Sequence, residues 1–304
     1  MIDLAIVILN WNTKDLLRKC LQTVFASEGD FAYQVVVVDN ASSDGSAEMV
    51  RQEFPKARVI ASEINGGYSY GNNLGLRWLG YGDAGKTRQD SPRYAVLLNS
   101  DTEVPPTAFF NMVQFMDARP DVGIAGPKLI LPDGSLDKAC RRSFPTPLVA
   151  FYHFSGLAKA FPKSPRFARY NMTFVDPDQE IEVDSVVGAY MQLRREAIND
   201  VGLLDETFFM YGEDLDWAYR VKKAGWKVVY HPEVTVWHIK RASSRKSQKA
   251  QFEFYRAMLI FYRKHYRATT PIWLHGLVLL GLALKGGRGL WKEIRRTPAA
   301  ATGG

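Results

Sequence analysis

The sequence predicts an α/β protein built on a mostly parallel, doubly wound sheet. Short β-branched runs alternate with helical patterns along the first third of the chain, as in folds with a parallel sheet. The 304 residues suit one large α/β domain, or two closely packed halves, with an appendage. Polar residues end the expected strands, at Asn10, Asp39, Glu63 and Asn99. Because ligands of such sheets bind beyond the carboxyl ends of the strands, these residues mark the expected site.

The first half of the chain alternates strands with helices. The apolar run 4–9 predicts a buried strand, and Asn12 or Thr13 can cap a helix over 14–27. The β-branched run before Asp39 is too short and too apolar for a surface helix, so 34–39 is a second strand. A helix over 46–53, a strand at 59–61, a helix over 67–79 and a strand at 94–98 follow, and Pro105 and Pro106 open another helix.

The second half is expected to close the sheet around a long loop. Residues 133–182 are irregular, with several prolines and aromatic residues, and are expected to shape a pocket. Strand patterns return at 181–187 and 191–193, and a short helix at 195–201 precedes an acidic segment. Residues 228–230 and 234–237 are expected to be closing strands.

The tail has a different character. Residues 248–267 predict an amphipathic helix, and 272–284 form a near-continuous apolar stretch of about thirteen residues, short of the ~20 that a spanning helix needs. Basic residues follow, at Lys285, Arg288, Lys292, Arg295 and Arg296. This pattern predicts a helix in the membrane interface with its basic flank on acidic headgroups. The alternative is a helix packed on the core or on a second subunit.

Charge and cysteine usage narrow the functional class. The formal net charge is +7, and basic proteins often bind anions such as nucleic acid, nucleotide phosphates or acidic lipid. Cys20 and Cys140 form no CxxC pair, which leaves zinc and redox motifs without support. The first residues lead into the first apolar run without a basic leader, so a cytoplasmic location is expected.

An acidic segment is the strongest catalytic candidate. Glu213, Asp214 and Asp216 crowd into four positions directly after the aromatic run 208–211. Neighbouring carboxylates repel one another, and an apolar wall raises the cost of ionising them. The segment therefore predicts a general base at the mouth of a pocket. The alternative is a set of partners for the dipole at a helix start.

Four further motifs have a functional and a structural interpretation each. The carboxylate of Asp39, followed by Asn40, can bind a base or ribose, or can simply cap a turn. The glycine- and amide-rich segment 65–73 suits phosphate or sugar oxygens, or forms an ordinary turn. Asp101, after Asn99 and Ser100, can hold a divalent ion that bridges two phosphates, or can be a solvated strand end. His238 is a core histidine unless Asp101 faces it.

Two familiar nucleotide motifs are not supported. Residues 80–87 match the P-loop pattern, but a helix is expected before them and no helix after them, so an exposed loop is expected. A dinucleotide-binding glycine motif is absent after the first strand, where Asn10-Trp11-Asn12 stands, and this argues against a dehydrogenase.

Taken in order, these segments resemble family 2 glycosyltransferases of the GT-A fold over about residues 3–245. The matching blocks lie at 7–12, 36–42, 67–73, 97–102, 188–196, 202–206, 213–216 and His238. The segment 140–146 further resembles a rhamnosyltransferase-like branch. That branch typically uses dTDP-L-rhamnose and polyprenyl-diphosphate-linked or polysaccharide acceptors.

The resemblance implies a role for each matching residue. Asp214 matches the catalytic base, with Glu213 beside it, and Asp101 matches the metal-binding aspartate of the DXD motif, with His238 completing the ion's shell. This chain has Asn99-Ser100-Asp101 in place of a full DXD, which weakens the expected affinity for Mg²⁺ or Mn²⁺. Asp39 would bind the pyrimidine base, and the remaining nucleotide-sugar residues would be Asn10, Asn12, Asn40, Gly67, Asn72, Asn73, Asn99 and Ser100.

The implied protein is an inverting enzyme with a GT-A mixed sheet and C-terminal helices. Its nucleotide-sugar half would span 1–103, its acceptor half 104–245 and its helical membrane-interface segment 246–304. It would take a nucleotide diphosphate sugar and a glycan or polyprenyl-diphosphate-linked acceptor, bind no nucleic acid, and lie on the inner face of the cell membrane. The alternatives are a sugar-phosphate nucleotidyltransferase, whose early phosphate loop is missing here, and a non-catalytic nucleotide-sugar-binding scaffold, which the Glu213–Asp214 pair argues against.

Overall fold

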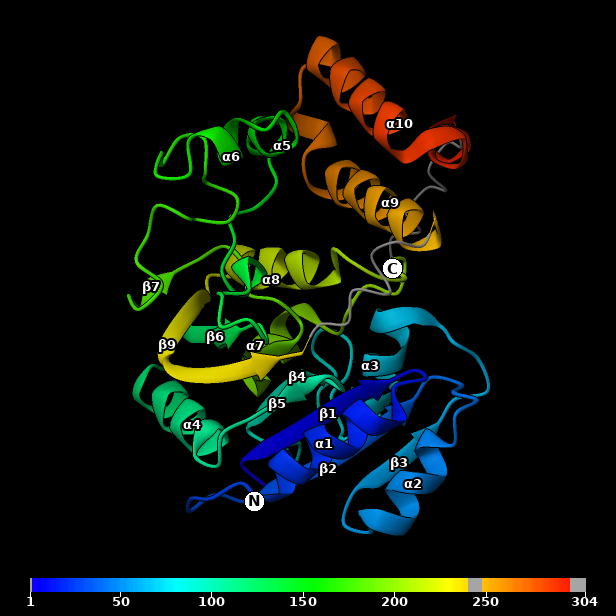
Figure 1. Cartoon of the computed structure of the whole chain (residues 1–304), viewed down its shortest axis with the longest axis vertical. Coiled ribbons are helices and arrows are strands. Elements are labelled where there is room, and N and C mark those ends of the chain that lie inside the picture. Colours follow the sequence, from blue (N-terminus) through cyan, green and yellow to red (C-terminus); the bar gives the residue numbers. More distant parts are fainter. Residues whose placement is uncertain (1, 240–247, 296–304) are drawn as a thin grey trace.

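A computed structural model describes residues 2–239 and 248–295 of the chain. Within these residues, nine strands form one mixed sheet in the order β3-β2-β1-β4-β8-β6-β9-β5, and β7 pairs with β9 (Figure 1). The strands are β1 Leu4–Asn10, β2 Tyr33–Asp39, β3 Arg58–Ala61, β4 Tyr94–Asn99, β5 Thr102–Glu103, β6 Val122–Ile130, β7 Ile181–Glu182, β8 Tyr190–Arg194 and β9 Lys227–His238.

The helices cover the sheet and extend the molecule along its long axis (Figure 1). They are α1 Lys14–Phe25, α2 Ser46–Glu53, α3 Gly67–Trp78, α4 Ala108–Ala118, α5 Pro147–Phe154, α6 Leu157–Ala160, α7 Arg195–Val201, α8 Glu213–Lys223, α9 Gln248–His265 and α10 Ile272–Arg295, with short 3₁₀ turns η1 Lys138–Cys140 and η2 Arg267–Thr269.

The first half follows the predicted parallel pattern. Strands β3, β2, β1 and β4 are parallel neighbours, and the apolar runs of β1 and β2 are buried because helices cover both faces. The second half makes the sheet mixed, since β8 is antiparallel to both β4 and β6. The predicted α/β class, the doubly wound mixed sheet and the C-terminal helices are confirmed.

The sequence did not predict strand β6, although it lies between β8 and β9. Glycine and proline lower strand propensity, and β6 contains Gly123, Gly126 and Pro127. The packing explains both glycines. A Cβ on Gly126 would approach Val186 to 2.7 Å, and one on Gly123 would approach the Trp226 side chain to 2.7 Å.

Two expected strand boundaries were wrong, and a segment expected to be irregular contains short helices. The two closing strands are a single strand, β9, in which the pairing with β6 shifts near Pro232, a residue with no N–H to donate. The strand expected over 181–187 ends at Glu182: the Val183 amide still bonds to Val228 of β9, but the amides of Asp184 and Ser185 bond to the Arg142 carbonyl instead. The loop 133–182 contains η1, α5 and α6.

Helix α9 packs against the sheet-containing part of the molecule through α8. Phe208 and Leu215 form an apolar cluster with Ala257, Met258 and Phe261 of α9. Helix α10 packs on α9 and runs past the expected apolar stretch to Arg295, with a kink at Gly287. Among the helices of the described residues, none combines the length and apolar character that a membrane span requires. The predicted boundary between 245 and 246, and the predicted basic residue Arg296, lie outside the described residues.

Candidate active site

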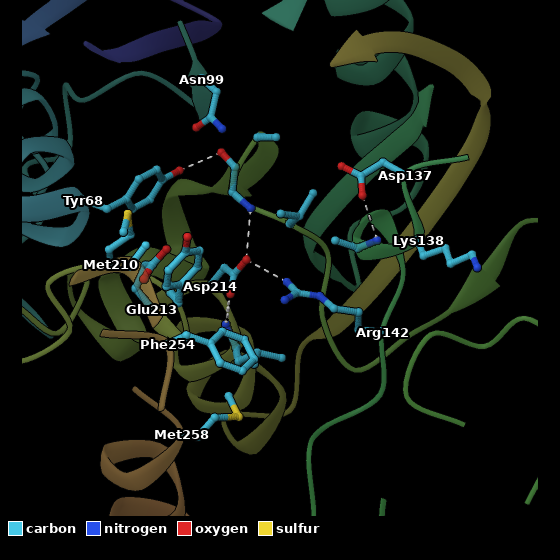
Figure 2. Close-up of a pocket in the computed structure, with 18 of the residues that line it drawn as sticks. Tyr68, Asn99, Asp137, Lys138, Arg142, Met210, Glu213, Asp214, Phe254 and Met258 are labelled. Carbon is cyan, nitrogen blue, oxygen red and sulfur yellow. Dashed lines mark hydrogen bonds and ion pairs between the residues drawn. The ribbon is translucent and has the colours of Figure 1, made fainter. Parts of the chain in front are cut away.

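A cavity of about 720 Å³ opens beyond the carboxyl end of β4. Five of the predicted site residues line it: Asn99, Asp101, Glu213, Asp214 and His238. Its other walls are Tyr68 of α3, the loop 187–189, the segment around Arg142, and one face of α9 (Figure 2). The two acidic groups that sequence analysis assigned to separate duties, Asp101 and Asp214, therefore share one cavity.

Asp214 is held in place by an ion pair and by backbone donors. Its Oδ2 lies 2.7 Å from an amino group of Arg142 and accepts a hydrogen bond of 3.2 Å from the Gly188 amide, as Figure 2 shows. Its Oδ1 accepts from the Leu215 amide at 2.7 Å. Asp214 and Arg142 are 6% and 8% exposed, so water screens this pair little. These contacts fix the position and orientation of the carboxylate.

Glu213 has a different environment from its neighbour. It begins α8 after Gly212, it is buried, and its Oε2 has no hydrogen-bond partner among the described residues. Burial, and then the charge of Asp214, raise the pKa of the Glu213 carboxyl above its usual range, although Arg142 opposes the shift. Glu213 therefore keeps its proton to a higher pH than an ordinary glutamate does.

Two further carboxylates, those of Asp101 and Asp137, flank the imidazole of His238. The pairing of β5 with β9 places Thr102 opposite His238, so Asp101 lies beside the imidazole. The Nε2 of His238 is 3.4 Å from Asp101 Oδ1, and its Nδ1 is 2.9 Å from Asp137 Oδ2. Burial opposes protonation of His238, but its hydrogen bonds to Asp101 and Asp137 outweigh this and raise its pKa. Asp101 therefore faces His238, as expected if the two residues bind one metal ion together.

The other predicted nucleotide residues form a hydrogen-bonded network at the ends of β1 and β2. Asn10 donates to Asp39 at 3.1 Å and to Ser42 at 3.2 Å, and Asp39 also accepts from the Ser42 amide. Asn12 accepts from the Ser43 amide at 2.8 Å. This network shapes the end of the parallel half of the sheet, but its residues do not line the cavity described above.

The glycine- and amide-rich segment is mostly structural in its contacts. Gly67 has φ of +90°, and a Cβ there would lie 2.3 Å from the Phe209 carbonyl oxygen. The side chain of Asn73 bonds to the backbone of Leu204, and that of Asn72 donates to the Tyr68 carbonyl. The remaining two predicted residues are also engaged: Asn40 donates to Asn65 and the Gly67 carbonyl, and the Ser100 hydroxyl contacts Thr13.

Sequence analysis missed three parts of the site. Asp137 stands in an irregular loop with no motif around it, and Arg142 was noted only within a family block. The α9 residues Phe254, Tyr255 and Met258 line the cavity, whereas α9 was assigned to the membrane segment. The P-loop match at 80–87 follows α3, and its Lys86 is exposed, so the expected exposed loop is confirmed.

Comparison with known proteins identifies the class. The chain superposes on a mannosyltransferase of Pyrobaculum calidifontis solved with GDP-Man and Mn²⁺, with a TM-score of 0.57 over 96% of this chain and 78% of that one, at 15% identity. It also superposes on GalNAc-T7 solved with UDP, GalNAc and Mn²⁺, with a TM-score of 0.60 over 97% of this chain and 56% of that one, at 15% identity. The fold is therefore that of the GT-A glycosyltransferases.

Sequence comparison then gives the family. The family model described as Glycosyltransferase like family 2 matches residues 3–256. The chain is 31% identical over 212 residues to the N-acetylglucosaminyl-diphospho-decaprenol L-rhamnosyltransferase of Mycobacterium tuberculosis, over 69% of this chain and 67% of that protein. It is 26% identical over 222 residues to the low-salt glycan biosynthesis hexosyltransferase Agl10 of Haloferax volcanii, over 73% of this chain and 62% of that protein. This chain belongs to glycosyltransferase family 2 and is a glycosyltransferase.

Proposed function

We propose that this enzyme is an inverting glycosyltransferase that moves a sugar, L-rhamnose, from a nucleotide diphosphate sugar to a lipid-linked acceptor. The observation that carries the proposal is that Asp101 and Asp214, from distant parts of the chain, line one cavity. The rhamnosyl donor and the polyprenyl-diphosphate acceptor are supported by the name of the mycobacterial relative and by the segment 140–146.

Asp214 is the proposed general base. It would remove the proton from the acceptor hydroxyl as that oxygen attacks the sugar from the face opposite the departing nucleotide. The guanidinium of Arg142, 2.7 Å from the carboxylate, and the Gly188 amide would hold Asp214 in place for this proton transfer. Burial and the charge of Asp214 raise the pKa of the neighbouring Glu213, which is therefore not the proposed base.

Asp101 and His238 are the proposed donors to a divalent cation, Mg²⁺ or Mn²⁺. Within residues 2–239 and 248–295, no group of three or more His, Cys, Asp or Glu side chains is arranged to hold a metal. A carboxylate and an imidazole nevertheless fit an ion that takes its remaining ligands from two phosphates and water. When bound, the ion would offset negative charge on the departing nucleoside diphosphate.

Asp137 is the proposed positioning residue for this pair. Ligating histidines usually donate their second N–H to a carboxylate, which fixes the tautomer and the ring orientation. Asp137 accepts at Nδ1 of His238, which leaves Nε2 for the ion on the side of Asp101.

The proposed division of the chain places the nucleotide in 1–103 and the acceptor in 104–245, with the C-terminal helices as a membrane contact. The hydrogen-bonded network at the ends of β1 and β2 and the contacts of the segment 65–73 support the first division. Asp39 and Asn10 would shape the base pocket. The loops around it would be held by Asn12, Asn40, Gly67, Asn72, Asn73, Asn99 and Ser100. Exposed apolar residues and nearby cations of α10 support its proposed position on the inner face of the cell membrane.

A product assay tests the proposed reaction. With dTDP-L-rhamnose and a polyprenyl-diphosphate-linked N-acetylglucosamine acceptor, we expect rhamnosylated lipid and free dTDP in equal amounts, whereas UDP- and GDP-sugars give less product. Release of pyrophosphate would instead identify a nucleotidyltransferase. Tight sugar-nucleotide binding without product on any acceptor would identify a non-catalytic scaffold.

Metal binding gives a second prediction. We expect Asp137→Asn to lower the affinity for Mn²⁺ by about 10- to 100-fold in the presence of dTDP, because His238 loses the partner that orients it. Asp101→Asn should lower it further by removing a ligand. The measurement is a Mn²⁺ titration followed by electron paramagnetic resonance. The matched control is Asp133→Asn, which changes an exposed carboxylate that accepts hydrogen bonds from the amide and hydroxyl of Ser135. Unchanged affinity in both active-site variants would refute the assigned metal site.

A further inference from the structure

The segment that carries α5 and α6 presents apolar side chains to solvent. Leu148 is 57% exposed, Phe151 59% and Phe161 52%. Contiguous exposed apolar residues in a folded protein mark a site of interaction with another protein or a membrane.

The same segment carries one sign of charge. Lys159, Lys163, Arg166 and Arg169 are exposed, and residues 147–175 contain no Asp or Glu. None of the ion pairs between described residues includes any of these four cations. Arg166 donates a hydrogen bond to the hydroxyl of Tyr152 and lies over the ring of Phe167. We call the three apolar residues and four cations the α5–α6 surface.

Helix α10 has a surface of the same kind. Trp273 is 66% exposed, Leu277 58% and Leu284 77%, and the cations Lys285, Arg288 and Lys292 follow. Between 271 and 295 Glu293 is the only acidic residue.

The two surfaces lie at one end of the molecule. The ring of Phe154 in α5 is 6.3 Å from that of Phe254 and 6.2 Å from that of Tyr255, both in α9, and α10 packs on α9 as well. Figure 1 shows α5, α6 and α10 together at the end of the long axis opposite α1 and α2. Helix α9 thus has α5 and α10 as neighbours and lines the cavity with a further face.

We propose that the α5–α6 surface binds an anionic lipid bilayer together with the exposed face of α10. This inference rests on the proposed membrane contact of α10 and extends it to a segment more than a hundred residues earlier in the chain. Apolar and aromatic side chains among cations, without acids, match the acyl boundary and the headgroups of an acidic leaflet. Contacts through both the α5–α6 surface and α10 would fix the orientation of the enzyme on the bilayer, whereas a contact through α10 alone would not.

This orientation brings the cavity to the lipid. His153 of α5 and Tyr255 of α9 both line the cavity, so its wall on this side is built from elements adjacent to the proposed membrane face. A lipid-linked acceptor would reach Asp214 from the side of the cavity to which α5 and α9 contribute, with its polyprenyl chain still in the bilayer.

Vesicle binding tests the proposal. The full chain is sedimented with vesicles of phosphatidylcholine alone, or of phosphatidylcholine with phosphatidylglycerol, at several salt concentrations. Each cation near an acidic surface contributes roughly a fivefold gain in affinity. We therefore expect Lys159→Glu/Lys163→Glu to weaken binding to the anionic vesicles by about 25-fold or more, least at high salt. Phe151→Ser/Phe161→Ser should weaken binding at every salt concentration.

The matched control is Lys19→Glu/Lys56→Glu, two exposed lysines at the opposite end, which should bind like the parent protein. Parent-like binding by both α5–α6 variants would overturn the proposal. A change in the self-association of these variants in sedimentation velocity would also overturn it, because the surface would then be an interface between copies of the chain. Release of dTDP in detergent with a short-chain acceptor should be unchanged in the variants. If the parent protein releases no dTDP in this assay, the proposed function is contradicted, whereas the vesicle experiment still tests membrane binding independently.

Discussion

Replacing Asp214 by asparagine should lower kcat by about 10²- to 10⁴-fold and leave the affinity for the donor nucleotide nearly unchanged. The amide cannot accept the acceptor's proton, while the contacts of Asp214 are with Arg142, Gly188 and Leu215, all outside the proposed nucleotide half. The measurements are steady-state kinetics and dTDP binding by calorimetry. An equal loss of nucleotide affinity and of kcat would contradict the assignment of Asp214 as the base.

The ion pair with Arg142 requires a further variant. Asp214→Asn leaves the buried guanidinium unpaired, and breaking such a pair typically costs about 3–5 kcal/mol of folding stability. The double variant Arg142→Met/Asp214→Asn removes both charges and should recover much of the melting temperature without recovering kcat. If the double variant regains activity together with stability, Asp214 has only a structural role. Asp121→Asn, which changes a surface carboxylate outside the cavity, should leave both quantities unchanged.

Replacing Asp216 by asparagine should lower the free energy of unfolding by about 3–5 kcal/mol, an effect as large as that expected for Asp214→Asn. Asp216 is 0% exposed. Its carboxylate binds Arg220 at 2.9 Å, Lys264 at 2.8 Å and His265 at 2.7 Å, and the last two belong to α9. The measurement is denaturant unfolding. Glu48→Gln removes a surface pair with Arg51 and should cost less than about 1 kcal/mol, which makes it the matched control.

The effect of Asp216 should depend on pH. Burial opposes ionisation of this carboxyl, but the bond to His265 and the charges of Arg220 and Lys264 outweigh burial and lower its pKa. A lowered pKa contributes stability that is fully present above the unfolded value of about 3.9 and is lost as the pH falls through the folded value. The difference in unfolding free energy between the parent protein and Asp216→Asn should therefore be constant near neutral pH and shrink below about pH 4. A constant difference down to pH 2 would show that the carboxylate charge is not what stabilises α9.

Local patterns were sufficient for much of the fold and for the acidic half of the site. The runs at 4–9 and 34–39 are apolar because helices cover both faces of a parallel sheet, and that burial is legible in composition alone. The acidic segment was recognisable because ionising several carboxylates beside bulky apolar residues costs free energy, and such an arrangement is typical of functional sites. The assignment of Asp214 as the base and of Asp101 as a metal ligand remains a prediction that the variants above test.

The sequence by itself determined the parallel half of the sheet, the family, and three of the acids that line the cavity, because those features depend on side-chain pattern within short segments. Only the tertiary structure decided that Arg142 pairs with Asp214, that Asp137 bonds to His238, and that α9 forms a wall of the cavity. Arg142 and Asp214 are 72 positions apart in the sequence, Asp137 and His238 are 101 apart, and the cavity-lining residues of α9 follow Asp214 by about forty positions. Contacts between residues so far apart depend on how the sheet and helices pack, which no local pattern encodes.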